Sequence, residues 1–261
     1  MNTDAIIEHI TDWLKAYVEK SGTHGFVVGV SGGIDSAVTS SLCARTGLPT
    51  LCVEMPIHQA ASQVTRAQEH IAQLKEKFPK VEEARLDLTP IFDSFVNALP
   101  EPDSDMHDHS LVNTRARFRM TTLYYFAGIR RAIVAGTGNK VEDFGVGFYT
   151  KYGDGGVDVS PIADLVKTEV FELGKVLGVP ESILIAPPTD GLWGDDRTDE
   201  DQIGASYPEL EWAMAQSDLG KDASDFSGRE KEVFEIYTRL HRANRHKMEP
   251  IPVCEIPEAY R

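Results

Sequence analysis

Hydrophobic residues follow two spacings along this chain, one typical of helices and one typical of strands. In residues 4–20 they recur every three or four positions, at Ile6, Ile10, Trp13, Leu14 and Tyr17, which predicts an amphipathic helix. Residues 25–30 form a continuous apolar run, GFVVGV, typical of a buried strand. The two patterns continue downstream. They predict helices over 35–46, 59–78, 110–130 and 167–177 and strands over 49–55, 81–87 and 131–138.

Turn residues mark where these elements end. Gly47 follows the second predicted helix, and Gly178 with Pro180 follows the one over 167–177, the residues that commonly end helices. Strands that alternate with helices predict an α/β fold, a mostly parallel sheet with helices on both faces. The length of 261 residues suits one domain over residues 1–261. Ligands of such sheets bind beyond the carboxyl ends of the strands.

Composition narrows the class of protein. No apolar run approaches the ~20 residues of a membrane span, and the acidic N-terminus is unlike a signal peptide. Cys43, Cys52 and Cys254 are widely spaced, which argues against a disulfide framework or a zinc site. The net charge of −15 disfavours duplex DNA or long RNA as a partner. We therefore expect a cytoplasmic protein that binds neither nucleic acid nor membrane.

Two polar segments interrupt the periodic pattern. Residues 99–110 are rich in Pro, Asp and His, and residues 186–204 are rich in acids. Either could ligate a cation, but an exposed loop is the better expectation for both. Loops of this length in compact domains are often functional.

The strongest chemical signal is SGGIDS, residues 31–36, between a predicted strand and a predicted helix. Its glycines let the backbone approach a ligand closely, and the helix N-terminus offers free N–H groups with partial positive charge. Together with the serine hydroxyls they suit a pyrophosphate group. Asp35 would repel phosphate, so it suits a Mg²⁺ ligand. No lysine follows the glycines, which excludes the Walker sequence.

Further motifs follow in order along the chain. NTRARFRM spans 113–120 and FYTKYGDGGVD spans 148–158. PPTDGLW, TDEDQIGASYPELE and RHK come later. SGGIDS matches the pyrophosphate loop of the ATP pyrophosphatase (PP-loop) superfamily, and the later blocks resemble NAD synthetase over nearly the whole chain after residue 25. The resemblance implies an adenine nucleotide alpha hydrolase-like, Rossmann-like fold.

The resemblance implies a C–N ligase that uses ATP and Mg²⁺. In that family the nicotinate carboxylate of deamido-NAD is adenylated with release of pyrophosphate, and ammonia then displaces AMP. The family's Mg²⁺ ligands correspond to Asp35 and Glu142. Its ATP contacts correspond to Gly29, Ser31, Gly32, Gly33, Asp35, Ser36, Thr137, Lys167 and Thr189. Its deamido-NAD contacts correspond to Arg117, Lys151, Asp158, His246 and Lys247.

Two of these residues are expected to act in catalysis. Lys167 would meet the phosphates of ATP, and Asp158 would position or deprotonate ammonium. In a helix, Arg117 points away from Arg115 and Arg119, so those two are expected to be solvated or paired with acids. The chain departs from the family pattern at GTGNKVED, where one residue is added before TKYGDGG, so the match at Glu142 is looser.

Nitrogen supply and assembly follow from the same resemblance. Glutamine-dependent relatives carry an added amidase domain, and the first predicted helix here is already that of the synthetase. We therefore expect free ammonia, or ammonia from a separate protein, as the nitrogen source. Family members of this length imply a homodimer.

Two other functions compete with this interpretation. One is another adenylating enzyme of the superfamily, with a different acceptor such as a nucleotide or a tRNA base. The acidic charge disfavours tRNA, and TKYGDGG disfavours the others. The second is a non-catalytic ATP-binding or sensing protein, against which the retention of Asp35, Glu142 and Lys167 argues.

Overall fold

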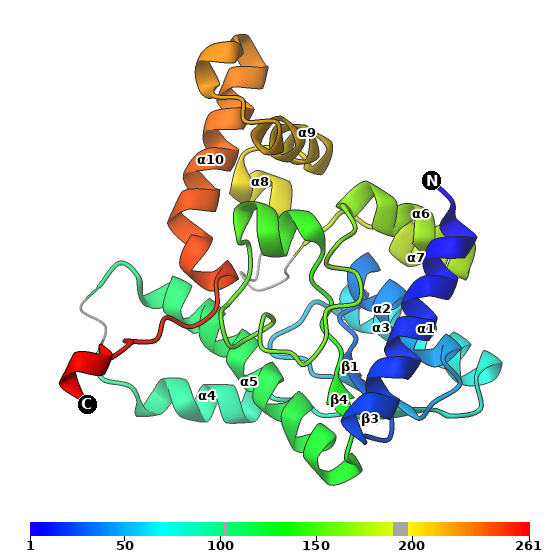
Figure 1. The fold of residues 1–261 in the computed structure, drawn as a ribbon. Coiled ribbons are helices and arrows are strands. Elements are labelled where there is room, and N and C mark those ends of the chain that lie inside the picture. Colours follow the sequence, from blue (N-terminus) through cyan, green and yellow to red (C-terminus); the bar gives the residue numbers. More distant parts are fainter. Residues whose placement is uncertain (102–103, 190–197) are drawn as a thin grey trace.

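The computed structural model describes residues 1–101, 104–189 and 198–261, and a four-stranded parallel sheet lies at its centre (Figure 1). The strand order is β3-β2-β1-β4. The strands are β1 (Phe26–Gly29), β2 (Thr50–Glu54), β3 (Val81–Arg85) and β4 (Ile133–Val134). All neighbouring strands pair in parallel, which confirms the predicted α/β fold.

Strand β4 is shorter than predicted. The apolar run over 131–138 suggested a full strand, but only Ile133 and Val134 pair with β1. Ala135 then bridges to Val159, and the Gly136 N–H donates to the carbonyl of Val159 at 2.8 Å. The chain therefore leaves the sheet at Gly136, and residues 136–140 become a loop at the sheet's carboxyl edge.

The helices lie close to the predicted ranges. Those that match are α1 (Thr3–Ser21), α2 (Ile34–Arg45), α3 (Ala61–Lys77), α5 (His107–Arg130) and α6 (Lys167–Leu177). Those that the pattern did not indicate are α4 (Thr89–Ala98), α7 (Glu181–Leu184), α8 (Asp199–Ile203), α9 (Tyr207–Asp218) and α10 (Gly228–Met248), with the short helices η1 (Val141–Val146), η2 (Ala223–Asp225) and η3 (Glu258–Tyr260).

Both polar segments contain helix, contrary to the loop prediction. Residues 107–110 form the first turn of α5, and residues 199–203 form α8. The rest of that prediction falls partly on residues 102–103 and 190–197, which lie outside the described residues. None of the three cysteines forms a disulfide, as expected. No helix in the described part of the chain is both long enough and apolar enough to cross a bilayer.

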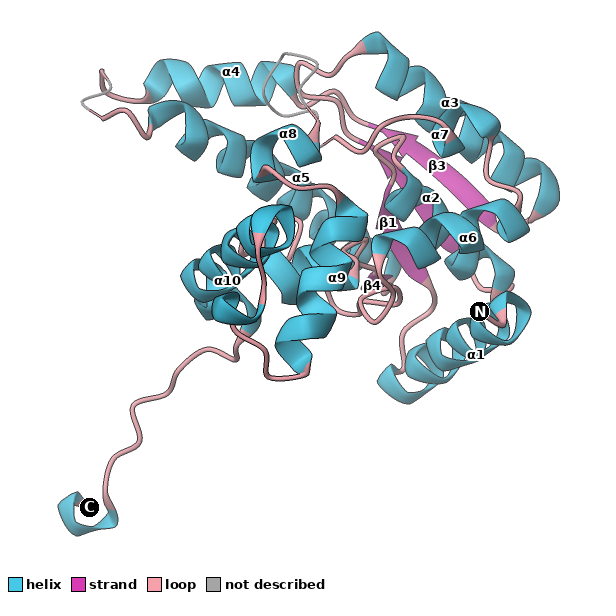
Figure 2. Cartoon of the chain, turned by 90° about the horizontal axis from the view of Figure 1, so that it is seen from above, coloured by secondary structure: helices cyan, strands magenta, loops and turns pink. Residues whose placement is uncertain are grey.

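Helices cover both faces of the sheet (Figure 2). Phe26 and Val28 of β1 pack with α1, α2, α6 and α7 in one core. Val27, which points to the opposite face, packs with residues of α4 and α5 in another. The successive residues Phe26, Val27 and Val28 are therefore all buried, which explains the uninterrupted apolar sequence of β1.

The C-terminal helices form a separate core against η1. Its members come from α8, α9, α10 and η1; they include Val141, Tyr207, Leu210, Val233 and Tyr237. Figure 1 shows α8, α9 and α10 gathered above the carboxyl edge of the sheet. This arrangement brings α9 next to η1 and α6, beside the strand ends.

Helix α2 contacts its neighbour α3 through Ser40, and the loop before α2 packs on α3 at Gly32. Ser40 donates to the carbonyl of Ser36 at 2.7 Å and contacts Nε2 of His70 on α3 at 2.9 Å. Burial lowers the pKa of His70 to about 4, and its side chain is 1% exposed. Before the helix, Gly32 has a φ of +85° and lies directly on α3, where an added Cβ would come within 2.4 Å of the carbonyl oxygen of Gln63.

We predict that His70 makes the fold sensitive to acid. An unfolded histidine takes up a proton below its ordinary pKa of 6.5, whereas folded His70 resists it down to about pH 4. The stability from neutral His70 is therefore complete above pH 6.5 and falls as the pH drops towards 4, by about 2 kcal/mol at pH 5. Urea denaturation at pH 7 and pH 5 measures the loss. His70→Gln should flatten this dependence, whereas His9→Gln, at an exposed position, should keep it.

Gly32 and Gly47 form a matched pair for a second prediction. Both have positive φ, but a Cβ at Gly47 meets nothing within 4 Å. Gly47→Ala should cost only the left-handed backbone strain of about 1–2 kcal/mol. Gly32→Ala should cost about 2 kcal/mol more, because the loop must also move off α3. Equal denaturation midpoints for the two variants would contradict the close packing of the loop on α3.

Candidate functional site

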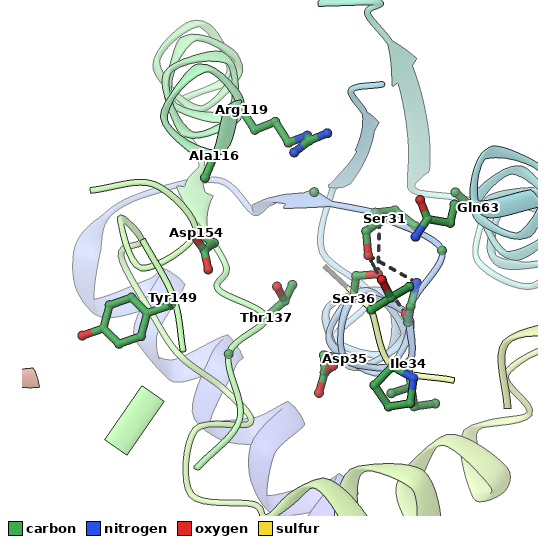
Figure 3. Close-up of a pocket in the computed structure, with 18 of the residues that line it drawn as sticks. Ser31, Ile34, Asp35, Ser36, Gln63, Ala116, Arg119, Thr137, Tyr149 and Asp154 are labelled. Atoms are coloured by element: carbon green, nitrogen blue, oxygen red, sulfur yellow. Dashed lines mark hydrogen bonds between the residues drawn. The ribbon is translucent and has the colours of Figure 1, made fainter. Parts of the chain in front are cut away.

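A cavity of about 280 Å³ opens at the carboxyl edge of the sheet (Figure 3). Its walls come from the loop after β1, the loop after β4, η1 and the starts of α3 and α6. Parallel strands place their C-terminal loops at one edge, so residues far apart in sequence meet there. The location agrees with the expectation from the sequence.

The loop of residues 31–36 forms one wall and is held by its own serines. The Ser36 hydroxyl donates to the carbonyl of Gly33 at 3.0 Å, and the Ser31 N–H donates to Oγ of Ser36 at 3.2 Å. The two hydroxyls lie 3.1 Å apart. Gly33 is the N-cap of α2 and supplies no side-chain cap, so the first N–H groups of this 12-residue helix remain for a ligand. Such an end favours an anion.

A buried ion triad also lines the cavity and includes Asp35 of the same loop. Nζ of Lys167 lies 2.5 Å from Oδ2 of Asp35 and 2.9 Å from Oε1 of Glu142. Lys167 is the first residue of α6, Asp35 lies in the first turn of α2, and Glu142 lies in η1. The Lys167 residue is 3% exposed. Burying a charge this deeply is costly unless partners compensate it, so the two carboxylates and the ammonium hold one another in place.

The pKa values in the triad follow from burial and charge. Burial opposes the charge of Lys167, but the two carboxylates outweigh it and raise the pKa of the ammonium above its ordinary value. Burial raises the pKa of Asp35, which Lys167 offsets only in part. For Glu142, Lys167 and the Tyr207 hydroxyl outweigh burial, and its pKa falls. Lys167 therefore remains a cation at neutral pH.

Three polar residues surround the triad. Asn139 donates to Oδ1 of Asp35 at 3.1 Å. The Tyr207 hydroxyl donates to Oε1 of Glu142 at 2.5 Å and lies 3.1 Å from Oδ2 of Asp199. The sequence analysis did not single out any of the three, although Asp199 and Tyr207 stand in the TDEDQIGASYPELE motif.

A further acid, Asp143, lines the cavity beside Gly138. Burial raises the pKa of Asp143 to about 8, with Glu142 adding to the effect. A Cβ at Gly138 would come within 2.2 Å of the Asp143 carboxylate, so any larger residue there would displace this carboxylate. The part of the cavity wall between the 31–36 loop and the loop after β4 therefore carries several acidic side chains.

Every residue predicted to bind ATP or Mg²⁺ lies at this cavity. They are Gly29, Ser31, Gly32, Gly33, Asp35, Ser36, Thr137, Glu142, Lys167 and Thr189. Glu142, where the motif match was looser, lies in a π-helix of six residues that ends at Gly147 with positive φ. A π-helix has i→i+5 hydrogen bonds, a rare geometry that often occurs at functional sites.

The residues predicted to bind deamido-NAD do not line the cavity. Four of them gather between α5, the loop over 147–156 and the end of α10. Lys151 donates to the carbonyl of His246 at 2.7 Å, and Arg117 donates to the carbonyl of Lys151 at 3.4 Å. Lys247 donates to the carbonyls of Gly147 and Tyr149, both at 2.8 Å.

The fifth, Asp158, lies apart from the other four. Its carboxylate accepts the Tyr124 hydroxyl at 2.9 Å and the Val134 N–H at 2.8 Å. It lines a second, shallower hollow with Trp13, Tyr17 and other residues. The structure therefore does not bring Asp158 and Lys167 to one point in this chain.

The position of Arg119 at the cavity was not predicted from the sequence. We expected Arg115 and Arg119 to be solvated or paired with acids. Arg119 lines the cavity (Figure 3) and donates to the carbonyl of Met55 at 3.1 Å and to Oε1 of Gln59 at 2.8 Å. Arg115 lies 5.0 Å from the ring centroid of Phe92. The opposite orientation of Arg117, which is exposed, was predicted correctly.

The donor set at the triad fits Mg²⁺. Asp35 and Glu142 both reach Nζ of Lys167, so their oxygens already converge on one cation. Among the described residues, no group of three or more His, Cys, Asp or Glu side chains has metal-site geometry. Two carboxylates suit Mg²⁺, which usually keeps waters and substrate phosphates as its other ligands.

Comparison with known proteins identifies the same family that the sequence motifs indicated. Residues 6–251 match the model of the family described as NAD synthase. The NH(3)-dependent NAD(+) synthetase of Methanosarcina mazei is 35% identical over 98% of this chain and 100% of its own length. That of Archaeoglobus fulgidus is 35% identical over 98% of each chain.

Solved structures share the fold. The NMN synthetase of Francisella tularensis has a TM-score of 0.85 and 32% identity, covering 99% of both chains. The NH3-dependent NAD synthetase of Campylobacter jejuni, in complex with nitrate, has a TM-score of 0.77 and 26% identity, covering 98% of this chain and all of its own. The resemblance found in the sequence is confirmed, and the chain belongs to the NAD synthase family of ligases.

Proposed function

We propose that this protein converts deamido-NAD to NAD with ATP and ammonia, through an adenylated intermediate. The observation that carries the proposal is that the 31–36 loop and the Asp35–Lys167–Glu142 triad, which share Asp35, line one cavity. A loop that holds pyrophosphate and a pair of carboxylates that holds a cation are what adenylation of a carboxylate needs. A non-catalytic ATP sensor would need no such pair.

The first step forms an acyl adenylate, a mixed anhydride of the carboxylate and the α-phosphate. A carboxylate oxygen of the nicotinate attacks the α-phosphorus of ATP, and the bond to the β-phosphate oxygen breaks with release of pyrophosphate. The N–H groups at the start of α2 and the loop serines would hold the departing pyrophosphate. Lys167, kept as a cation by its two carboxylates, would donate to a phosphate oxygen and stabilise the charge that develops there. Asp35 and Glu142 would hold Mg²⁺, which would further neutralise the charge of the phosphates.

The second step forms the amide. Ammonia attacks the carbonyl carbon of the acyl adenylate, AMP leaves with the electron pair of its C–O bond, and the nitrogen loses one proton. Free ammonia or ammonia from a separate protein would supply the nitrogen. A role for Asp158 in positioning ammonium remains a prediction, because its carboxylate is held by Tyr124 and Val134 outside the main cavity.

Assembly would complete the deamido-NAD site. The outer face of α5 exposes Tyr125 and Ile129, each by more than 60%, and exposed apolar patches often mark interfaces. We propose that the protein is a homodimer and works in the cytoplasm. A second copy on this face would lie near Arg117, which is also on α5.

The reaction itself provides the first test. With ATP, Mg²⁺, deamido-NAD and ammonium chloride, we expect equal amounts of NAD and AMP. Asp35→Asn should lower the rate by about 100-fold or more, because a ligand of the phosphate-bound cation is lost. Asp164→Asn, at a 97%-exposed side chain, serves as the control. ATP binding without formation of AMP would favour the sensor instead.

A second acceptor has its own support. The Francisella protein, an NMN synthetase, matches this chain with a higher TM-score and identity than the Campylobacter NAD synthetase does. The alternative is therefore amidation of nicotinate mononucleotide, which has the same carboxylate and lacks the adenylate half. The chemistry at Lys167 would be the same for both acceptors.

Competition between the two acceptors decides the question. We expect kcat/KM for deamido-NAD to exceed that for nicotinate mononucleotide by at least about tenfold, roughly 1.4 kcal/mol. The reason is that the adenylate half of deamido-NAD would bind the basic side chains of Arg117, Lys151 and Lys247, and the mononucleotide lacks that half. Lys151→Met should erase this preference with little effect on the mononucleotide. A preference for the mononucleotide in the unaltered protein would establish the second candidate.

A further inference from the structure

One residue joins the C-terminal core to the ion triad. Tyr207 lies at the first position of α9, in the core shared with η1 and α10. Its hydroxyl reaches Glu142 and its ring lies under Lys167. We propose that Tyr207 is a positioning residue that fixes the carboxylate of Glu142 for the cation of the reaction. This inference rests on the function proposed above.

The hydrogen-bond geometry assigns the proton of the hydroxyl. Tyr207 has one O–H donor and two carboxylate neighbours, Oε1 of Glu142 at 2.5 Å and Oδ2 of Asp199 at 3.1 Å. The shorter distance directs the donor to Glu142. A charge-assisted bond of this kind is roughly twice as strong as a neutral one, and the residue is only 3% exposed. The bond is therefore well shielded from competing water.

The bond also determines which carboxylate oxygen is used. Lys167 and Tyr207 both donate to Oε1 of Glu142. Oε2 is then the oxygen that a cation between Glu142 and Asp35 would take. Without the hydroxyl, Lys167 is the remaining donor to Oε1 among the residues that the structure describes, and the carboxylate turns more freely about its last side-chain bond.

The ring has a separate role. Nζ of Lys167 lies 4.7 Å from the centroid of the Tyr207 ring, within the range of a cation–π contact. The ring also packs among Leu210, Val233 and Tyr237 in the C-terminal core. Tyr207→Phe keeps both of these contacts and removes only the hydroxyl. It therefore separates positioning of Glu142 from folding.

Mg²⁺-dependent binding of ATP tests the proposal without turnover. Titration calorimetry with ATP at increasing Mg²⁺ gives the concentration of Mg²⁺ for half-maximal binding. Tyr207→Phe should raise this concentration about tenfold, as loss of a residue that orients a metal ligand usually does. Tyr237→Phe, at a buried tyrosine of the same core that stacks on His241, should leave it unchanged. Thermal unfolding of both variants checks that the fold is retained.

A double variant tests whether Tyr207 acts through Glu142. In Glu142→Gln the carboxylate is already lost, so adding Tyr207→Phe should change the Mg²⁺ requirement by no more than about twofold. A full tenfold change on that background, or a Tyr207→Phe protein with the unaltered Mg²⁺ requirement, would overturn the inference alone. If ATP binding by the unaltered protein did not depend on Mg²⁺, the proposed cation site would fail as well.

Discussion

The buried ammonium of Lys167 is the contact on which the site depends. Its two partners, Asp35 and Glu142, come from segments 107 residues apart, and Lys167 lies 25 residues further on. A 3%-exposed ammonium needs partners of opposite charge, and both carboxylates reach it. The sheet order places the loop after β1 beside the loop after β4, through the β1–β4 pairing. Removing Lys167 would leave two buried carboxylates without their shared cation.

The same triad links stability to chemistry. A pair of carboxylates that already surrounds one cation suits a divalent cation bound to phosphate, and Lys167 can then turn its donors to the phosphates. Burial that raises the pKa of Asp35 also strengthens every charge interaction in the cavity. The C-terminal core takes part through Tyr207, so a helix pair that looks peripheral in Figure 1 supports the centre of the site.

The spacing of hydrophobic and turn residues predicted the parts of the fold that depend on local contacts. Helix α6 has the predicted bounds, and Gly178, with a φ of +72°, ends it. Strand β1 is apolar throughout because helices cover both its faces. The prediction was too long for β4, since the apolar residues after Val134 leave the sheet to build the cavity wall. Helix α10 was missed because its buried residues, Val233, Phe234 and Tyr237, lie in its first half and a charged second half follows.

The predictions for the site also divide into those that the sequence supported and those that depend on long-range packing. The resemblance to the family identified residues that meet at the cavity, and among them those of SGGIDS and Lys167 stand at helix starts. It could not locate Arg119, whose partners Met55 and Gln59 are about 60 residues away, nor Tyr207, whose role arises from the packing of α9 on η1. Arg117, Lys151 and Asp158 matched the family motif, yet they face away from the cavity in one chain. A motif specifies which side chains a reaction uses, whereas only packing, within this chain or against a second copy, specifies where they meet.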